Sequence, residues 1–409
     1  MPRVKVSARP EDVGLSSAGM EELDAYLRSE VDAGTIPGAV IVVARKGRVC
    51  HAVASGMHTI ATDRPLLLGD GFRIFSMTKP VTAAGLMMLW DEGRWRFDDP
   101  VALHLPELGG LQVYDGHNAD GSIRVVNAEH QPTMRELVTH TAGFGYALAM
   151  PDPNDPIDEV YRQAGVWDAD DLPDMMQRIA RCPLAYQPGT SWRYSIGMDI
   201  QGAIIERLTG TSLSDFLSDR LFAPLGMDDT HFHIAPNQKD KLATLYLRFG
   251  NANLTPIHNL LQPDYEAAHA RPLGGSGLFS TAGDYTRFAQ FLLDGCSHSG
   301  VELLSREAIH QIMSDQMPDA LRANSFTAGH QSIGLGIAMG VNGVVFTDPE
   351  LAGAPVGRGT YQWDGAAGTW FWIDPENDLL CVGMTQVLSP DGPNLQRNTQ
   401  QIIYCSISA

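Results

Sequence analysis

Strand-forming segments gather at the two ends of this chain, whereas its middle has the spacing of helices. Residues 38–44 are a short apolar run that predicts a strand, and Lys46-Gly47 predicts a turn into a second strand at 49–54. Beyond residue 274, the segments that fit strands are 334–338, 343–346, 369–373 and 379–387. We therefore expect one antiparallel sheet that is built from both termini and flanked by helices.

Apolar residues at helical spacing predict a helix over 16–34, with Ser16 or Ser17 as the candidate N-cap. The other expected helices are 80–92, 133–140, 171–181, 197–209, 212–221 and 395–406. The 409 residues allow two domains or one large domain with an insertion. We predict an α/β (α+β) fold with a sheet domain at 1–75 plus 270–409, a mostly helical domain at 76–269, and an active site at their interface.

Charge and cysteine content argue against several classes of protein. The formal net charge is −19, and no four Lys or Arg residues follow one another, so neither a nucleic acid nor an anionic membrane is expected as a partner. The five cysteines are too scattered for a disulfide framework or a cysteine zinc site. The N-terminus lacks the apolar core of a signal peptide, and no apolar run approaches the roughly 18 residues that span a bilayer. We expect a cytoplasmic enzyme.

The strongest candidate for a catalytic motif is Ser76-Met77-Thr78-Lys79, which follows a short apolar run and opens an expected helix. A spacing of three places both side chains on one helix face, so a nucleophile and its proton acceptor can come from one turn. Ser-x-x-Lys also arises by chance on solvated helices. Here the helix is apolar on all sides, and a lysine buried in it must be paired or neutralised. We therefore interpret Lys79 as a functional lysine with a shifted pKa, rather than as part of a chance match.

Two further segments could complete such a site. Tyr194 precedes an apolar helix, and its phenol could share a proton with Lys79, although a plain core tyrosine is the alternative. In Gln362-Trp363-Asp364-Gly365-Ala366-Ala367-Gly368, the small residues allow close approach of backbone to a ligand. A strand N–H there could join the Ser76 N–H as an oxyanion hole, and a β-bulge is the alternative.

Other patterns are weaker. His231 and His233 alternate as in a strand but lack further ligand spacing, so we expect no metal and no cofactor. Gly334-Leu335-Gly336 lacks the context of a dinucleotide loop. The sequence has no Gly-x-Ser-x-Gly nucleophile elbow. A Ser-His-Asp triad is formally open, with His140 as its best histidine, although a structural role in a loop is favoured for this residue.

Taken in order, these segments resemble the serine β-lactamase and penicillin-binding-protein superfamily. Within it, the chain is most similar to the family VIII carboxylesterases and the related statin-side-chain acyltransferases. The resemblance covers nearly the whole chain and implies a β-lactamase-like fold. The matching segments are 72–82 around Ser76, Leu137-Val138-Thr139-His140-Thr141-Ala142-Gly143-Phe144, Tyr194-Ser195-Ile196, 274–284 and Trp363-Asp364-Gly365.

Two departures separate this chain from the lactamase and peptidase branches. Those branches usually have asparagine where this chain has Ile196, and Lys-Thr-Gly where it has Trp363-Asp364-Gly365. The lost amide and ammonium would otherwise hold a β-lactam, whereas apolar surface suits an uncharged ester. The resemblance thus implies a serine carboxylesterase that acts on short- to medium-chain esters through an acyl-enzyme on Ser76.

The expected roles follow from that reaction. Ser76 is the nucleophile, Lys79 and Tyr194 relay its proton, and by motif position the N–H groups of Ser76 and Ala366 form the oxyanion hole. Transfer to an alcohol or amine, a β-lactamase or D-alanyl peptidase activity, and a silent ligand-binding protein remain as alternatives. The oligomeric state is left open. The residues expected to contact substrate are Trp363, Asp364 and Gly365, together with Tyr146 and the loop at 151–156.

Overall fold

The chain builds its main sheet from two distant segments. The computed structural model describes residues 4–147, 155–234, 236–258, 271–297 and 299–408. Within them, one sheet has the strand order β12-β13-β14-β15-β16-β1-β2-β3, and its pairings are antiparallel. The strands are β1 (Gly38–Arg45), β2 (Arg48–Thr59), β3 (Arg64–Pro65), β12 (Ile337–Met339), β13 (Val344–Phe346), β14 (Tyr361–Gly365), β15 (Thr369–Asp374) and β16 (Leu379–Met384).

The two ends of the chain meet where β1 pairs with β16, with Val42 opposite Val382. Successive side chains of a strand point to opposite faces, and β1 is apolar on both. Val40 and Val42 enter the large core, whereas Ile41 and Val43 enter a second core on the other face. This strand can therefore sit in the middle of the sheet with both faces covered. The expectation of an antiparallel sheet built from both termini is confirmed.

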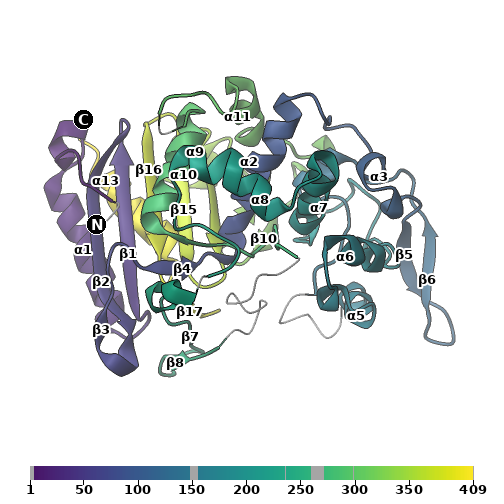
Figure 1. Ribbon diagram of the computed structural model, residues 1–409, viewed down its shortest axis with the longest axis horizontal. Helices are drawn as coiled ribbons and strands as arrows, with labels where there is room; N and C mark the ends of the chain where they lie inside the picture. Colours follow the sequence, from purple (N-terminus) through teal and green to yellow (C-terminus); the bar gives the residue numbers. More distant parts are fainter. Residues whose placement is uncertain (1–3, 148–154, 235, 259–270, 298, 409) are drawn as a thin grey trace.

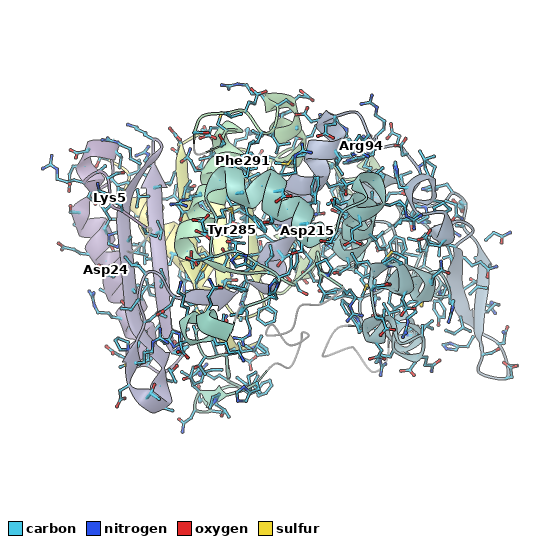
Figure 2. The ribbon with its side chains drawn as sticks, viewed as in Figure 1. Lys5, Asp24, Arg94, Asp215, Tyr285 and Phe291 are labelled. Atoms are coloured by element: carbon cyan, nitrogen blue, oxygen red, sulfur yellow. The ribbon has the colours of Figure 1, made fainter. Side chains whose placement is uncertain are left out.

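Helices cover both faces of the sheet (Figure 1). The two terminal helices, α1 (Ser17–Asp32) and α13 (Leu395–Cys405), pack on one face. Ser16 caps α1 by accepting a hydrogen bond from the Gly19 N–H at 3.1 Å. On the other face lies α10 (Ala282–Asp294), whose Tyr285 ring is 5.1 Å from that of Phe371 on β15 (Figure 2).

The region between the two sheet segments is mostly helical, as expected (Figure 1). Its helices are α2 (Thr78–Asp91), α3 (Val101–His104), α4 (Met134–Val138), α5 (Pro156–Gln163), α6 (Leu172–Ile179), α7 (Gly197–Thr209), α8 (Leu213–Leu217) and α9 (Ala223–Leu225). It also holds the unexpected hairpin β5 (Gln112–His117) and β6 (Ile123–Asn127), whose exposed strands have little apolar alternation to reveal them.

Some boundaries differ from the sequence expectation. The strand expected from 334 begins at Ile337, because Gly334 and Gly336 have φ of 134° and 85°. The helices α10 and α11 (Arg306–Ile312) lie in the region expected to hold strands. In the range expected to be helical, β7 (Tyr246–Leu247) and β8 (Thr255–Pro256) form a small sheet with β17 (Val387–Leu388). The division into two domains stays a prediction.

Among the described residues, none of the helices combines the length and apolar character that crossing a bilayer requires.

Candidate active site

Ser76 lies in a short 3-10 turn, Phe75–Met77, that leads directly into α2. Phe75, immediately before it, has φ of 43°, a conformation that a bulky residue rarely adopts. Buried hydrogen bonds anchor the turn: the Tyr285 hydroxyl donates to the Met77 carbonyl at 2.9 Å, and the Leu278 N–H donates to Thr78 Oγ1 at 3.2 Å. Strained backbone held by such contacts is typical of functional sites.

The structure brings the three predicted catalytic side chains together on one oxygen. Lys79 Nζ donates to Ser76 Oγ at 3.1 Å, and the Tyr194 hydroxyl donates to the same oxygen at 2.7 Å. Ser76 and Lys79 come from one turn of chain, whereas Tyr194 arrives from the residues just before α7. Ser76 and Tyr194 are partly exposed, and Lys79 is fully buried. The predicted nucleophile is therefore accessible from solvent, whereas the Lys79 amine is shielded from water.

The surroundings of Lys79 bring the pKa of its amine close to neutral pH. Burial lowers the pKa of Lys79 to about 7, against the opposing effect of the Asp199 and Asp364 carboxylates. Its Nζ also donates to the Gly275 carbonyl at 2.6 Å and lies 4.6 Å from the Tyr194 ring centroid. An amine with this pKa can accept a proton near neutral pH.

Tyr194 is held by aromatic neighbours. Its ring lies 6.0 Å from the Trp363 ring in a stacked arrangement and 4.9 Å from the His140 ring. Burial is the main cause that raises the pKa of Tyr194 above its usual value, and the hydrogen bond to Ser76 opposes it. The phenol therefore stays protonated at neutral pH, which suits a proton donor.

Comparison with known proteins identifies the architecture around this site. The Beta-lactamase family model matches residues 23–405. The chain belongs to the β-lactamase family. Protein Rv1367c of Mycobacterium tuberculosis is 32% identical over 366 residues, which cover 88% of each chain. Esterase EstB of Burkholderia gladioli is 29% identical over 400 residues, which cover 93% of each chain.

A solved structure extends the likeness to the whole fold. EstCE1, described as a hydrolase with promiscuous acyltransferase activity, has a TM-score of 0.77 at 25% identity. The match covers 95% of this chain and all of EstCE1, 100%. The predicted superfamily and the β-lactamase-like fold are thus confirmed. Proteins with this fold thus include an esterase and a hydrolase with promiscuous acyltransferase activity.

Tyr146, expected to contact substrate, lies beside the Lys79 amine of this β-lactamase-family site. Its ring centroid is 5.5 Å from Lys79 Nζ, and its ring meets that of Tyr194 edge-on at 5.3 Å. Burial raises the pKa of Tyr146 well above its usual value. Its contact with substrate stays a prediction. Residues 151–154 of the expected pocket loop lie outside the described residues.

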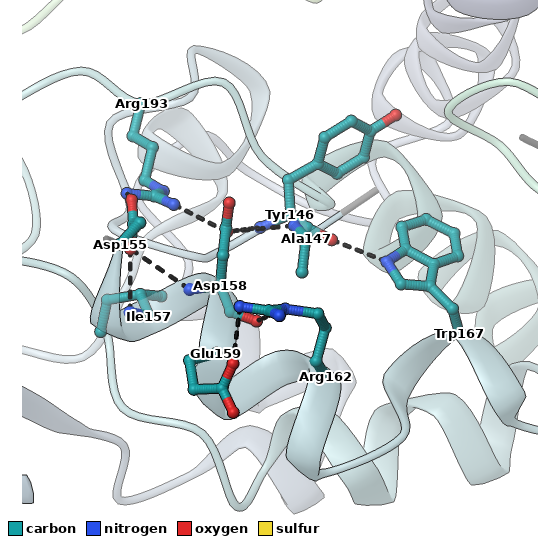
Figure 3. Close-up of polar contacts among 9 residues, drawn as sticks. All are labelled: Tyr146, Ala147, Asp155, Ile157, Asp158, Glu159, Arg162, Trp167 and Arg193. Atoms are coloured by element: carbon teal, nitrogen blue, oxygen red, sulfur yellow. Dashed lines mark hydrogen bonds and ion pairs between the residues drawn. The ribbon is translucent and has the colours of Figure 1, made fainter. Parts of the chain in front are cut away.

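Asp155, Asp158 and Arg193 form a cluster of ion pairs and hydrogen bonds, called the clasp below, that holds the backbone at Tyr146 (Figure 3). Asp158 Oδ1 accepts from the Ala147 N–H at 3.0 Å and from Arg193 Nη2 at 2.8 Å. Arg193 also pairs with Asp155 at 2.5 Å. Since Arg193 directly precedes Tyr194, the clasp joins the backbones of the two tyrosines that flank Lys79.

The third motif lies against the turn that carries Ser76. A Cβ on Gly365 would lie 2.3 Å from the Ile74 carbonyl oxygen, so only glycine permits this approach. Ala366 follows at the end of β14 and is exposed. Trp363 is 1% exposed and packs behind Tyr194, while Asp364 on the opposite face accepts from Gln331 Nε2 at 2.9 Å. Substrate contact by these residues stays a prediction.

Sequence reasoning did not single out Asp199, nor Gly275 within the matching segment 274–284. Asp199 lies in the first turn of α7, where its Oδ1 accepts from the Gly275 N–H at 3.2 Å. Burial raises the pKa of Asp199 to about 6, and Lys79 opposes this. The Gly275 carbonyl in turn binds Lys79. An acidic residue inside an apolar helix is the signal that could have revealed Asp199.

His140 does not contact Ser76 and belongs to the packing around Tyr194. Its Nδ1 accepts from the Ser195 N–H at 3.1 Å, and burial lowers its pKa well below the usual value. The structural role favoured for this residue agrees with that geometry. Among the described residues, no group of three or more His, Cys, Asp or Glu could hold a metal ion.

Proposed function

We propose that this protein is a serine carboxylesterase of the family VIII type, which hydrolyses short- to medium-chain esters through an acyl-enzyme on Ser76. The observation that carries the proposal is the pair of hydrogen bonds to Ser76 Oγ, from Lys79 Nζ at 3.1 Å and from the Tyr194 hydroxyl at 2.7 Å. A serine flanked by an amine and a phenol has both a proton acceptor and a proton donor within reach.

The pKa directions support separate roles for the two flanking groups. Lys79, with a pKa of about 7, offers a lone pair that takes the Ser76 proton as Oγ attacks the ester carbonyl. Tyr194, whose pKa is raised by burial, keeps its proton and donates it to the departing alcohol. Lys79 then returns a proton to Tyr194, which restores the pair for attack by water on the acyl-enzyme.

The oxyanion would be held between the turn at Ser76 and the end of β14. The Ser76 and Ala366 N–H groups are the proposed donors, and the close contact of Gly365 with Ile74 supports their proximity. Loss of one such donor typically costs about 3 kcal/mol of barrier.

Ester chemistry is favoured over β-lactam chemistry by the polarity of two positions. Ile196 is fully buried and apolar, so no amide at this position is available to a lactam. Trp363 lies buried where a lysine ammonium would hold a lactam carboxylate, as expected from the family motif. Poor turnover of a chromogenic cephalosporin relative to esters is the expected result.

Acyl transfer is the second candidate, because EstCE1 is described as having promiscuous acyltransferase activity. An alcohol that replaces water at the acyl-enzyme would leave as an ester product. Adding increasing concentrations of a primary alcohol should then divert product from acid to ester without changing the release of p-nitrophenol, provided that acylation limits the rate.

The proposed function is tested with p-nitrophenyl butyrate and the Ser76→Ala variant. We expect wild-type turnover and a loss of at least about 1,000-fold in the variant. Mass spectrometry of the wild type should show a butyryl adduct on the peptide that contains Ser76. Equal activity in both proteins, or an adduct elsewhere, would overturn the assignment.

A further inference from the structure

An apolar cavity of about 590 Å³ opens beside the third motif. Its wall includes Asp364, Gly365 and Ala366, so it starts at the proposed oxyanion hole. The remainder is largely apolar and includes Phe249, Trp370, Val387 and Leu388. A cavity of this size holds a small organic group.

Asp364 is the one acidic side chain on this wall. Among the described lining residues, His330 is the only other titratable group, and there is no lysine or arginine. The described part of the chain contains no ion pair to Asp364. His330 and Lys79 act on Asp364 through space and favour its anionic form, but neither forms an ion pair with it.

Instead, a line of buried amides points its donors at this carboxylate. Gln400 Nε2 donates to Gln362 Oε1 at 2.7 Å, and Gln362 Nε2 donates to Gln331 Oε1 at 2.9 Å. Gln331 Nε2 then donates to Asp364 Oδ2 at 2.9 Å. Neutral donors orient a carboxylate and favour its anionic form without supplying a positive charge. Burial acts in the opposite direction and raises the pKa of Asp364.

Ala366, a proposed oxyanion donor, also lines the cavity and so places it beside the reacting carbonyl. Asp364 lines the same cavity, with its side chain on the face of β14 opposite Trp363. The alcohol portion of an ester held at Ala366 can thus extend past Asp364 into the cavity. An apolar wall with aromatic rings and one carboxylate, held by a neutral amide, is the chemistry that recognises alkylammonium groups.

We propose that this cavity binds the alcohol portion of the substrate and that Asp364 selects alcohols carrying an alkylammonium group. The inference rests on the proposed esterase function and names its substrate class. In acyl transfer, the same cavity would receive the incoming alcohol, since the acceptor enters where the leaving alcohol departs.

The test compares butyrylcholine with its uncharged carbon isostere, 3,3-dimethylbutyl butyrate, at about pH 8, where imidazoles are neutral. We expect kcat/KM for the cation to exceed that for the isostere by about tenfold or more. In Asp364→Asn, the ratio should fall close to one, whatever the absolute rates. The exposed Asp391, on the loop that borders the cavity, provides the charge-matched control, and Asp391→Asn should keep the wild-type ratio.

The inference would be overturned if the wild-type enzyme turned over both substrates with equal kcat/KM, or if Asp391→Asn lost as much selectivity as Asp364→Asn. Turnover of p-nitrophenyl butyrate would still support the esterase proposal in either case. A binding measurement makes the inference independent of catalysis. Calorimetry of the Ser76→Ala protein should show choline binding at least about tenfold more tightly than 3,3-dimethylbutanol. Equal or reversed affinities would refute the site even if the esterase proposal also failed.

Discussion

The hydroxyl of Tyr194 lies 2.7 Å from Oγ of Ser76, although 118 residues separate them in the chain. Lys79, in contrast, reaches the same oxygen from three residues away. The site thus combines a local pair, which one helical turn creates, with a distant phenol that tertiary packing delivers.

Tyr194→Phe should lower kcat/KM by about 100- to 10,000-fold, because the phenyl ring keeps the packing but cannot donate a proton. The loss should be greater for an alkyl ester than for a p-nitrophenyl ester, since p-nitrophenolate leaves without protonation. Tyr114→Phe, which removes a hydroxyl bonded to His117 on the surface, provides the control. Equal losses with both substrates would contradict a role as proton donor.

The pH profile should report the coupled Lys79 and Asp199 pair. The proposed mechanism requires the neutral amine, so kcat/KM should rise as pH increases through about 7, the pKa of Lys79. The Asp199 carboxylate favours the ammonium form, so Asp199→Asn should move this acid limb to lower pH. A limb that stays in place or moves to higher pH would contradict the pairing. Asp98→Asn, at a side chain that is 90% exposed, should leave the profile unchanged.

Arg193→Lys should loosen the clasp that holds the Tyr146 backbone. Lysine cannot reach Asp155 and Asp158 together with the fork geometry of arginine, so we expect a loss of about 1–3 kcal/mol in unfolding free energy. KM should rise as Tyr146 shifts. Arg162→Lys changes an ion pair to Glu159 in which both side chains are well exposed, and should cost less than about 0.5 kcal/mol. Similar denaturation midpoints for both variants would refute the clasp.

Gly365→Ala should distort the approach of β14 to the Ser76 turn. The added Cβ would lie 2.3 Å from both the Ile74 carbonyl oxygen and Thr369 Oγ1. We expect about 1–3 kcal/mol of destabilisation and a fall in kcat. Gly69→Ala, where a Cβ would meet nothing within 4 Å, is the matched control. If both substitutions had equally small effects on thermal stability and on kcat, the close approach of Gly365 to Ile74 would not limit the residue at this position.

Local patterns in the sequence predicted much of this protein. The apolar run of β1, the Ser16 cap of α1 and the bounds of α7 were visible because they depend on neighbours in the chain. The exposed hairpin β5–β6 and the helix α10 were missed. The first has weak alternation, and the second lies among strand-like segments.

By itself, the sequence determined the local pair of Ser76 and Lys79, since a spacing of three on a helix sets their proximity. Only the tertiary structure decided that Asp199 and Gly275 would surround that amine, because burial and electrostatic coupling arise from residues distant in the chain. It also decided the faces of β14, with Trp363 behind Tyr194 and Asp364 toward the cavity. A sequence motif gives the identity of the residues, but the pleat of a paired strand decides to which face each side chain points.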